Sequence, residues 1–278
     1  MILSVASGKG GTGKTSVAVN MALSIGNVQL IDCDAEEPNV YLFLKPKISK
    51  TKAIEVSVPI VNEKLCNRCG KCADFCQYNA LFVGSNEVLV FADLCHSCGG
   101  CALVCPAGAI SEVKYRIGTL KQGATETVNL VYGELEVQKP MAVPIIREVK
   151  RHIRKDKNVI LDSPPGTSCP VIQTLKGSDF CILVTEPTPF GLHDLKIIVQ
   201  VLETMEMPFG VVVNRAGVGD KKVYEFCEEK TIPVLLEIPY DRRIAELYSQ
   251  GIPFSEEMPE WKNKFRTLFE NVKELVKK

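Results

Sequence analysis

The chain has 278 residues and a balanced charge, with 33 basic and 33 acidic side chains. Hydrophobic residues make up 46% of it and its mean hydropathy is +0.08, which is typical of a folded globule and excludes a disordered or collagen-like chain. The balanced charge also argues against nucleic acid as a partner. No apolar run approaches the roughly 18 residues of a membrane span, and residues 1–7 lack the basic and apolar regions of a signal peptide. We therefore expect a cytoplasmic protein.

Cysteine is unusually abundant and unevenly placed. The chain has twelve cysteines, of which eight fall between Cys66 and Cys105. In a reducing compartment disulfides do not persist, so clustered thiols are better explained by metal binding. The other four are scattered along the chain, and of these Cys33, Cys181 and Cys227 are assigned no role.

Short apolar runs rich in valine and isoleucine alternate with helix-length segments along most of the chain. The runs predict buried strands of a parallel sheet at 2–6, 28–31, 159–161, 181–184, 210–213 and 234–238. Apolar residues at three and four spacing predict helices at 15–25, 145–154, 192–205, 221–230 and 242–248. This alternation indicates an α/β fold, with a doubly wound and mostly parallel sheet.

The alternation breaks between residues 53 and 137. There the cysteine-rich block is followed by alternating stretches at 113–117 and 127–132, which predict antiparallel strands. We interpret 53–137 as an insertion, with the cysteine-rich part at 60–112. The α/β domain would then be discontinuous, made of residues 1–52 and 138–278.

A glycine-rich loop between the first predicted strand and helix has the form of a P-loop. Its glycines let backbone N–H groups turn toward a phosphate, Lys14 reaches the β- and γ-phosphates, and the Thr15 hydroxyl ligates Mg²⁺. A chance glycine-rich turn would have no reason to sit between a strand and a helix. The motif predicts that ATP is bound by Gly8, Lys9, Gly10, Gly11, Thr12, Gly13, Lys14, Thr15 and Ser16.

Carboxylates follow two other predicted strands. Asp32 and Asp34 end the strand at 28–31, and Asp162 ends the strand at 159–161 in the Walker B form. Ligands of open α/β sheets bind at these strand ends, so Asp162 is expected to reach Mg²⁺ and Asp32 to help hold the metal shell. The alternative is that they are ordinary strand-end aspartates that cap helices.

The second lysine of the loop, Lys9, makes the chain resemble the deviant Walker A ATPases, the superfamily of MinD, ParA, ArsA, Mrp and the nitrogenase iron protein. The resemblance implies an ATP-bound homodimer in which Lys9 reaches the partner's nucleotide, and it makes Asp34 the residue that orients the attacking water. Lys9, Lys14 and Asp34 are thus the expected catalytic residues. By the same resemblance Asn214 reads adenine, and a loop that includes Pro239 and Asp241 closes over the base. An asparagine after a buried strand is also a common turn residue.

The eight clustered cysteines form two runs of the pattern CxxCxxCxxxC. This is the bacterial ferredoxin spacing, in which three cysteines of a run bind one [4Fe-4S] cube and the fourth binds the other cube. All-cysteine zinc sites are the alternative, but zinc modules separate their CxxC pairs by longer loops. The first run lacks the proline that follows Cys105, having Gln77 after Cys76, which affects cluster tuning rather than ligation. The expected sets are Cys66, Cys69, Cys72 and Cys105 for one cube, and Cys95, Cys98, Cys101 and Cys76 for the other.

Three further features have two interpretations each. Cys169 follows the Walker B segment. It either reports the nucleotide state or holds metal at a dimer face, or it is a helix-start or core cysteine. His96, between two cysteines, is expected to tune a cluster rather than to ligate it. The apolar stripe of the C-terminal segment, 261–276, predicts either a helix packed on the sheet or, as in MinD proteins, a membrane-binding helix.

Together these motifs predict a Mg²⁺-dependent ATPase that carries an inserted ferredoxin domain. The favoured hypothesis is that nucleotide-driven dimer or switch changes are coupled to electron transfer through the two clusters to a redox or metalloenzyme protein partner. The alternatives are an Mrp-like carrier of iron-sulfur clusters or metal and a MinD-like positioning ATPase. Membrane binding is not expected, because a MinD-like role leaves the clusters without a purpose.

Overall fold

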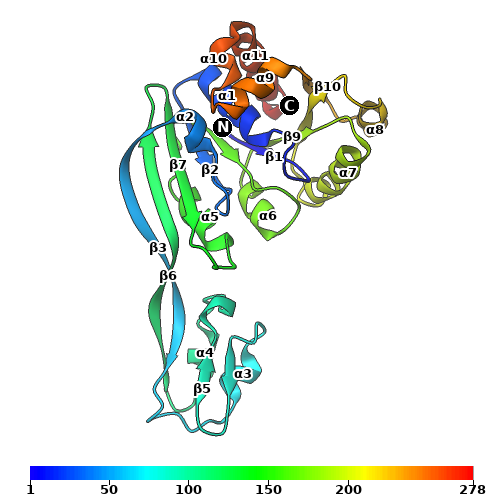
Figure 1. Cartoon of the computed structure of the whole chain (residues 1–278). Helices are drawn as coiled ribbons and strands as arrows, with labels where there is room; N and C mark the ends of the chain where they lie inside the picture. The colour runs from blue at the N-terminus through cyan, green and yellow to red at the C-terminus, as the bar shows by residue number, and fades with distance from the viewer. Residues whose placement is uncertain (278) are drawn as a thin grey trace.

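A nine-stranded sheet forms the centre of the molecule, in a computed structural model that describes residues 1–277 (Figure 1). The strand order is β11-β10-β9-β1-β8-β2-β7-β6-β3, and the strands from β11 to β7 are parallel. This confirms the predicted α/β class and mostly parallel sheet. The parallel strands are β1 (Ile2–Ala6), β2 (Val28–Asp32), β7 (Val128–Leu135), β8 (Asn158–Asp162), β9 (Phe180–Thr185), β10 (Phe209–Ala216) and β11 (Val234–Pro239).

Helices cover both faces of the parallel part of the sheet (Figure 1). On one face α1 (Lys14–Ile25), α10 (Phe254–Glu257) and α11 (Pro259–Lys277) share a core with Leu3 and Val5 of β1. On the other face α6 (Cys169–Leu175), α7 (Pro189–Thr204) and α8 (Lys222–Glu229) pack on β9 and β10, and α5 (Val143–Lys150) packs on β8. Every residue of β2 and β9 is buried, which explains why these strands read as continuous apolar runs.

The antiparallel part of the sheet is built by β3 (Lys47–Val61) and β6 (Ile110–Ala124), which pair along their whole lengths. Only 118–124 of β6 also pairs with β7. Beyond that point β3 and β6 leave the body as a two-stranded ribbon (Figure 1). The sheet therefore extends into the segment 53–137, because β7 lies beside β2 and β6 lies beside β7.

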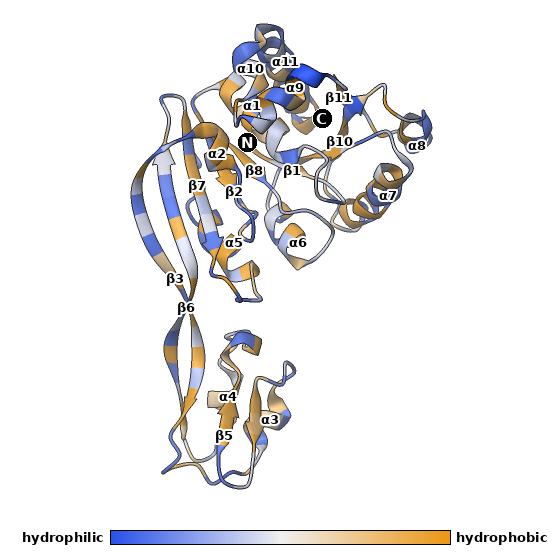
Figure 2. Ribbon diagram, in the orientation of Figure 1, coloured by the Kyte–Doolittle hydropathy of each residue, from blue (hydrophilic) through white to orange (hydrophobic). Residues whose placement is uncertain are grey.

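The ribbon carries the cysteine module, defined here as residues 62–109, at its far end. The module contains α3 (Lys71–Phe75), the hairpin β4 (Leu81–Val83) and β5 (Val88–Val90), the 3₁₀ turn η1 (Ala92–Leu94) and α4 (Gly100–Leu103). Its hairpin is apolar (Figure 2), but its buried side chains are few and include two of the cysteines, Cys95 and Cys101.

The C-terminal helix α11 packs on the body. Its apolar side chains are buried beside α1, and Arg266 Nε donates to the Ser24 carbonyl at 2.7 Å. The buried residues are Trp261, Phe265, Leu268, Phe269 and Val272. Within residues 1–277, no helix is both long enough and apolar enough to span a bilayer.

Two shorter helices complete the fold. Helix α2 (Val40–Leu44) leads from the loop after β2 into β3, and α9 (Arg242–Ser249) follows β11. Asp241 caps α9, since its Oδ1 accepts from Arg243 N at 2.8 Å. Both helices lie beside the carboxyl ends of the parallel strands, where a ligand of such a sheet is expected.

Candidate functional site

The glycine-rich loop joins β1 to α1 in a shape that only glycine allows at two positions. Gly13 has φ +97°, and a Cβ there would lie 2.4 Å from Asn214 Nδ2. A Cβ on Gly8 would lie 2.3 Å from the carbonyl oxygen of Asp194. The loop is thus pressed between β10 and α7, and its backbone N–H groups and the first turn of α1 lie beside a cavity.

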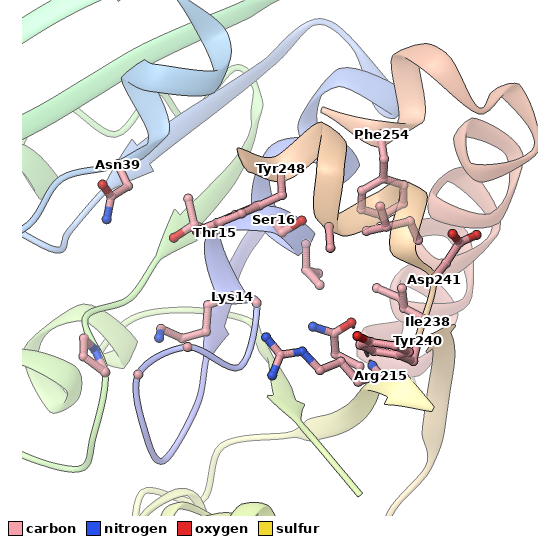
Figure 3. Close-up of a pocket in the computed structure, with 18 of the residues that line it drawn as sticks. Lys14, Thr15, Ser16, Asn39, Arg215, Ile238, Tyr240, Asp241, Tyr248 and Phe254 are labelled. Carbon is pink, nitrogen blue, oxygen red and sulfur yellow. Dashed lines mark hydrogen bonds between the residues drawn. The ribbon is translucent and has the colours of Figure 1, made fainter. Parts of the chain in front are cut away.

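A cavity of about 640 Å³ opens beside this loop (Figure 3). Lys14, Thr15 and Ser16 lie at its phosphate-loop side, and Arg215 and Tyr240 lie across from Lys14. Of the predicted nucleotide-binding residues, those that line the cavity are Gly10, Gly11, Gly13, Lys14, Thr15, Ser16, Asn214, Pro239 and Asp241. Ile238 and Tyr240, from the loop that the resemblance places over the base, also line it. The sequence did not indicate Arg215, Tyr248 or Phe254, which line it as well.

Two carboxylates meet at the end of the sheet near Lys14. Asp32 and Asp162 are partners in the parallel register of β2 and β8, and each is 1% exposed. Asp32 holds the loop that follows it, because its Oδ1 accepts from Asp34 N at 3.0 Å and its Oδ2 accepts from Asn39 N at 3.0 Å and from Val40 N at 3.1 Å. Both Asp32 oxygens are therefore engaged by backbone amides that shape residues 34–40.

Burial raises the pKa of all three aspartates near the loop. The pKa of Asp162 rises to about 7, opposed by a hydrogen bond from Thr15 and by the charge of Lys14, and that of Asp34 rises to about 6. The pKa of Asp32 is raised well above its usual value by burial and by Asp162. Burial lowers the pKa of Lys14, opposed by Asp162 and Asp34. A cation between these groups would favour their ionised forms.

The chemistry of this corner fits Mg²⁺. Within residues 1–277, Asp162 Oδ1 is buried and makes no hydrogen bond. The Thr15 hydroxyl is a second oxygen beside the same carboxylate. Mg²⁺ prefers one or two such oxygens together with phosphate and water.

Lys9 lies apart from this group. Its Nζ is 3.7 Å from Glu186 Oε2, and Arg215 Nη1 is 2.8 Å from Glu186 Oε1. Lys9 and Gly8 line a separate small depression against α7, together with Thr12. The structure thus brings Lys14 and Asp34 to one cavity and directs Lys9 to Glu186, a buried residue that the sequence did not indicate.

Asn214 braces the phosphate loop. Its Nδ2 donates to the Thr12 carbonyl at 2.8 Å, and its Oδ1 accepts from Arg215 N at 2.9 Å. Within a single chain, the amide that the resemblance assigns to adenine is thus hydrogen-bonded to the loop that surrounds the phosphates.

The eight clustered cysteines separate into two sets in space. One set, Cys76, Cys95, Cys98 and Cys101, lines a cavity of about 440 Å³. The other set, Cys66, Cys69, Cys72 and Cys105, lines a narrower cavity. Each cavity takes three cysteines from one run and the last cysteine from the other.

The surroundings of these thiols suit anionic sulfur. Backbone N–H groups point at three of them: Ala80 N to Cys76 Sγ at 3.3 Å, Ser97 N to Cys95 Sγ at 3.4 Å and Ala109 N to Cys105 Sγ at 3.3 Å. Burial raises the pKa of the Cys72, Cys95 and Cys101 thiols, an effect that bound iron reverses.

The spacing of the thiols distinguishes between kinds of metal site. In the described part of the chain, no three His, Cys, Asp or Glu side chains converge as ligands of a single ion. A zinc ion needs such convergence. A [4Fe-4S] cube does not, because its four thiolates bind four different irons and surround a volume. Each cavity gathers four thiols, which is the number of protein ligands that one such cube takes.

Two other predicted features have clear positions. Cys169 is exposed at the start of α6. His96 stacks on Tyr78, with ring centroids 3.5 Å apart and planes 11° apart, and both line the cavity of the Cys95 set.

Comparisons with known proteins agree with this fold and loop. A family model described as the CobQ/CobB/MinD/ParA nucleotide binding domain matches residues 3–254. An uncharacterized protein of Methanocaldococcus jannaschii is 33% identical and the match covers 91% of each chain. An iron-sulfur cluster carrier protein of Pyrococcus abyssi is 25% identical, over 90% of this chain and 78% of its own. The septum site-determining protein MinD of Pyrococcus horikoshii, solved with Mg-ADP, has a TM-score of 0.61 at 20% identity, covering 99% of this chain and 96% of its own, and shares the fold.

Proposed function

This chain belongs to the CobQ/CobB/MinD/ParA nucleotide-binding family, and on that premise we propose that it is a Mg²⁺-dependent ATPase coupled to electron transfer through two [4Fe-4S] clusters. The observation that carries the proposal is the separation of eight cysteines into two crossed sets of four, in a module tied to the nucleotide-binding body by a two-stranded ribbon. The module, within the inserted segment 53–137, is then a ferredoxin-like domain.

The phosphates of ATP lie against the glycine-rich loop in this proposal. Lys14 neutralises charge on the β- and γ-phosphates, and Thr15 and Asp162, whose Oδ1 has no other partner within residues 1–277, are the residues that would hold Mg²⁺. Asp34 lines the same cavity and orients the attacking water. Asp32 acts through the backbone of residues 34–40, which its two oxygens hold in place.

Lys9 acts from a second copy of the chain. In one subunit it is held by Glu186 and does not line the cavity beside Lys14. A lysine that approaches from the partner supplies positive charge to the transferred phosphoryl group only when two subunits close on ATP. The active species is then a homodimer.

The clusters, when bound, supply one-electron transfer. The chain's own contribution is to hold eight thiolates, to direct backbone N–H groups at three of them, and to line the cavity of the Cys95 set with Tyr78 and His96. Hydrogen bonds to sulfur and limited solvent access tune the potential of such clusters. The partner is a redox protein or a metalloenzyme.

A carrier of iron-sulfur clusters is the second candidate. Its support is the similarity to proteins named as iron-sulfur cluster carriers. Its difficulty is that all eight cysteines of the module fall into the two sets of four, so no further pair in the module is left for a labile cluster. A MinD-like positioning role has less support, because the apolar face of α11 is buried in the core.

The test is anaerobic purification followed by iron and sulfide analysis, EPR after reduction, and redox titration with and without MgATP. We expect about eight irons per chain and a nucleotide-dependent change in the potential or reoxidation rate of a cluster. Clusters that are present but indifferent to nucleotide would overturn the electron-transfer proposal in favour of the carrier. Absence of clusters after anaerobic reconstitution would exclude both.

A further inference from the structure

An ion pair joins the nucleotide-binding body to the cysteine module. Lys139, which follows β7, places its Nζ 3.1 Å from Asp93 Oδ1 in η1. The Tyr115 hydroxyl, on the part of β6 that has left the body, donates to the same Asp93 oxygen at 2.9 Å. Lys139 also contacts the Tyr115 hydroxyl and lies 4.1 Å from the centre of its ring. Three segments therefore meet at one carboxylate.

Asp93 is close to a cysteine set. It precedes Cys95 by two residues, and the Cys95 backbone N–H donates to the Ala92 carbonyl at 3.1 Å, which closes the turn that contains Asp93. Cys95 is one of the four cysteines around the larger cavity. A shift of Asp93 therefore moves a proposed cluster ligand.

The other end of the connection reaches the phosphate site. Ala35, next to Asp34, accepts at its carbonyl a hydrogen bond of 2.8 Å from Leu135 N at the end of β7. Glu136 N then donates to Ile117 O on β6 at 2.9 Å, and Lys139 N donates to Glu136 O at 3.0 Å. The loop of Asp34 is thus linked by consecutive backbone hydrogen bonds to the turn that carries Lys139.

We propose that Lys139, Asp93 and Tyr115 form a latch through which the Asp34 loop sets the position of the cysteine module against the body. All three are positioning residues, since none lines the nucleotide cavity. The inference rests on the proposed function and names the route by which nucleotide reaches the clusters. Closure of residues 34–37 on a γ-phosphate pulls Leu135 and its turn, and Lys139 transmits the movement to Asp93.

The ribbon makes such a latch necessary. Between Ile110 and Ile117, β6 pairs only with β3, and the ladder shifts register between Ile54 and Glu55 close to the point where the ribbon leaves the body. An isolated pair of strands is only marginally stable in water. The ribbon alone would therefore let the module rotate relative to the body. The latch bridges this stretch from β7 to η1.

The latch is also suited to opening and closing. The Asp93 side chain is 51% exposed and that of Lys139 is 19% exposed. Exposed ion pairs contribute little to stability and are screened by salt, so a small movement of the loop is enough to break or re-form one. Tyr115 keeps Asp93 facing the body while Lys139 leaves.

The experiment compares Lys139→Met and Asp93→Asn with a control, Lys121→Met. Lys121 pairs with Glu134 at 2.8 Å across β6 and β7 but touches nothing in the module. Hydrogen exchange of residues 92–98 and 110–117 is measured in the loaded protein with and without a non-hydrolysable MgATP analogue, together with the cluster reoxidation rate. We expect wild type and the control to respond to nucleotide in both readouts, and the two latch variants to lose most of the response while retaining nucleotide binding and iron.

A charge exchange separates the latch from general damage. Lys139→Asp combined with Asp93→Lys restores the pair in reverse, and we expect it to recover a large part of the response that either single change removes. A latch variant that folds, binds nucleotide and responds as wild type does would overturn the inference. If wild type itself shows a hydrogen-exchange response but no redox response, the proposed function fails while the latch survives.

Discussion

The two regions of this protein are organised by different physics. The nucleotide cavity lies at the end of strands whose side chains are buried on both faces, so packing holds its residues in place. The cysteine module buries few apolar side chains, chiefly Ala80, Leu81, Val88 and Ala109. It leaves others, such as Phe82 and Leu103, exposed. A segment this small rarely folds on apolar burial alone and depends on a staple such as metal. Damage to one region should therefore leave the other intact.

The largest expected effect follows from removing the charge at the phosphate loop. Lys14→Ala takes away the ammonium that lies beside Asp162 and Asp34 in the cavity. We expect the ATPase kcat/KM to fall by about 10²- to 10³-fold, as for other lost charge-stabilising groups. Iron content should stay the same, because the module does not contribute to this cavity. Steady-state ATPase assays and iron analysis on one preparation test both halves.

Lys9→Ala, compared with Lys14→Ala, tests whether Lys9 acts in its own subunit or on the nucleotide of the partner. Because Lys9 lies against Glu186 and outside the cavity, a single subunit should still bind nucleotide without it. The dependence of the specific ATPase activity on protein concentration should disappear, because it arises when Lys9 of one subunit acts on the nucleotide of the other. If Lys9→Ala weakened nucleotide binding as much as Lys14→Ala, Lys9 would be acting within its own subunit.

Replacing single cysteines tests the module in the same way. Cys105→Ser should lower the iron content from about eight to about four per chain and leave ATPase activity unchanged. Because Cys105 lines the cavity of the first run, adding Cys69→Ser should cost no further iron, whereas adding Cys98→Ser should remove the second cluster. Iron and sulfide analysis with EPR measures this.

The exposed cysteine of the body provides the control for that series. Cys169→Ser changes a thiol that lies outside both cavities, and it should keep all the iron. If the Cys105→Ser and Cys98→Ser changes together removed only one cluster, the sets would not be crossed and each run would hold its own cube.

The body was more predictable from sequence than the ribbon. Strands buried on both faces read as continuous apolar runs, and β9 (Phe180–Thr185) and β2 (Val28–Asp32) appear close to where they were predicted. Strand β3 was not predicted, because its first residues, Lys47–Ala53, are exposed on a sheet edge and carry no alternation of apolar and polar side chains. Helix α2 was missed because five residues are too few to show a helical period.

The same contrast holds within the candidate sites. Lys14, Thr15 and the cysteines belong to motifs with fixed spacing, which the sequence displays directly. Glu186 and Lys139 are single charged residues whose partners lie far away in sequence, so no local pattern could indicate them. Asn214 was assigned to adenine by resemblance, and its bond to Thr12 depends on tertiary packing of β10 on the loop.

The raised carboxyl pKa values predict how the body responds to pH. In protein without Mg²⁺ and nucleotide, burial raises the folded pKa of Asp162 to about 7, above the roughly 3.9 of an unfolded aspartate. The folded state then favours the protonated form, so the contribution of Asp162 to stability is fully present below about pH 4 and is lost as pH rises through about 7. Asp162→Asn should flatten this decline and leave the protein more stable than wild type at pH 8. Chemical unfolding at pH 5 and pH 8 measures it.

Asp34 supplies the matched control for the pH series. Its pKa rises only to about 6, so Asp34→Asn should flatten the decline less and over a narrower range, from about pH 4 to 6. Mg²⁺ with nucleotide should stabilise wild type at pH 8 and have little effect on Asp162→Asn. A pH dependence between pH 5 and pH 8 that Asp162→Asn leaves unchanged would contradict the raised pKa of Asp162.

The smallest effect is expected at Asn214, which lies between the phosphate loop and Arg215. Asn214→Ala removes the donor to the Thr12 carbonyl, a bond that contributes about 1 kcal/mol and hence about a fivefold change in the KM for ATP. Asn214→Asp keeps the acceptor for Arg215 N but cannot donate and adds a negative charge beside the loop, so it should weaken ATP binding more than the alanine variant does. Measuring KM for ATP and GTP distinguishes the two roles of this amide. If it only braces the loop, both nucleotides weaken equally, and if it reads adenine, the preference for ATP over GTP falls with it.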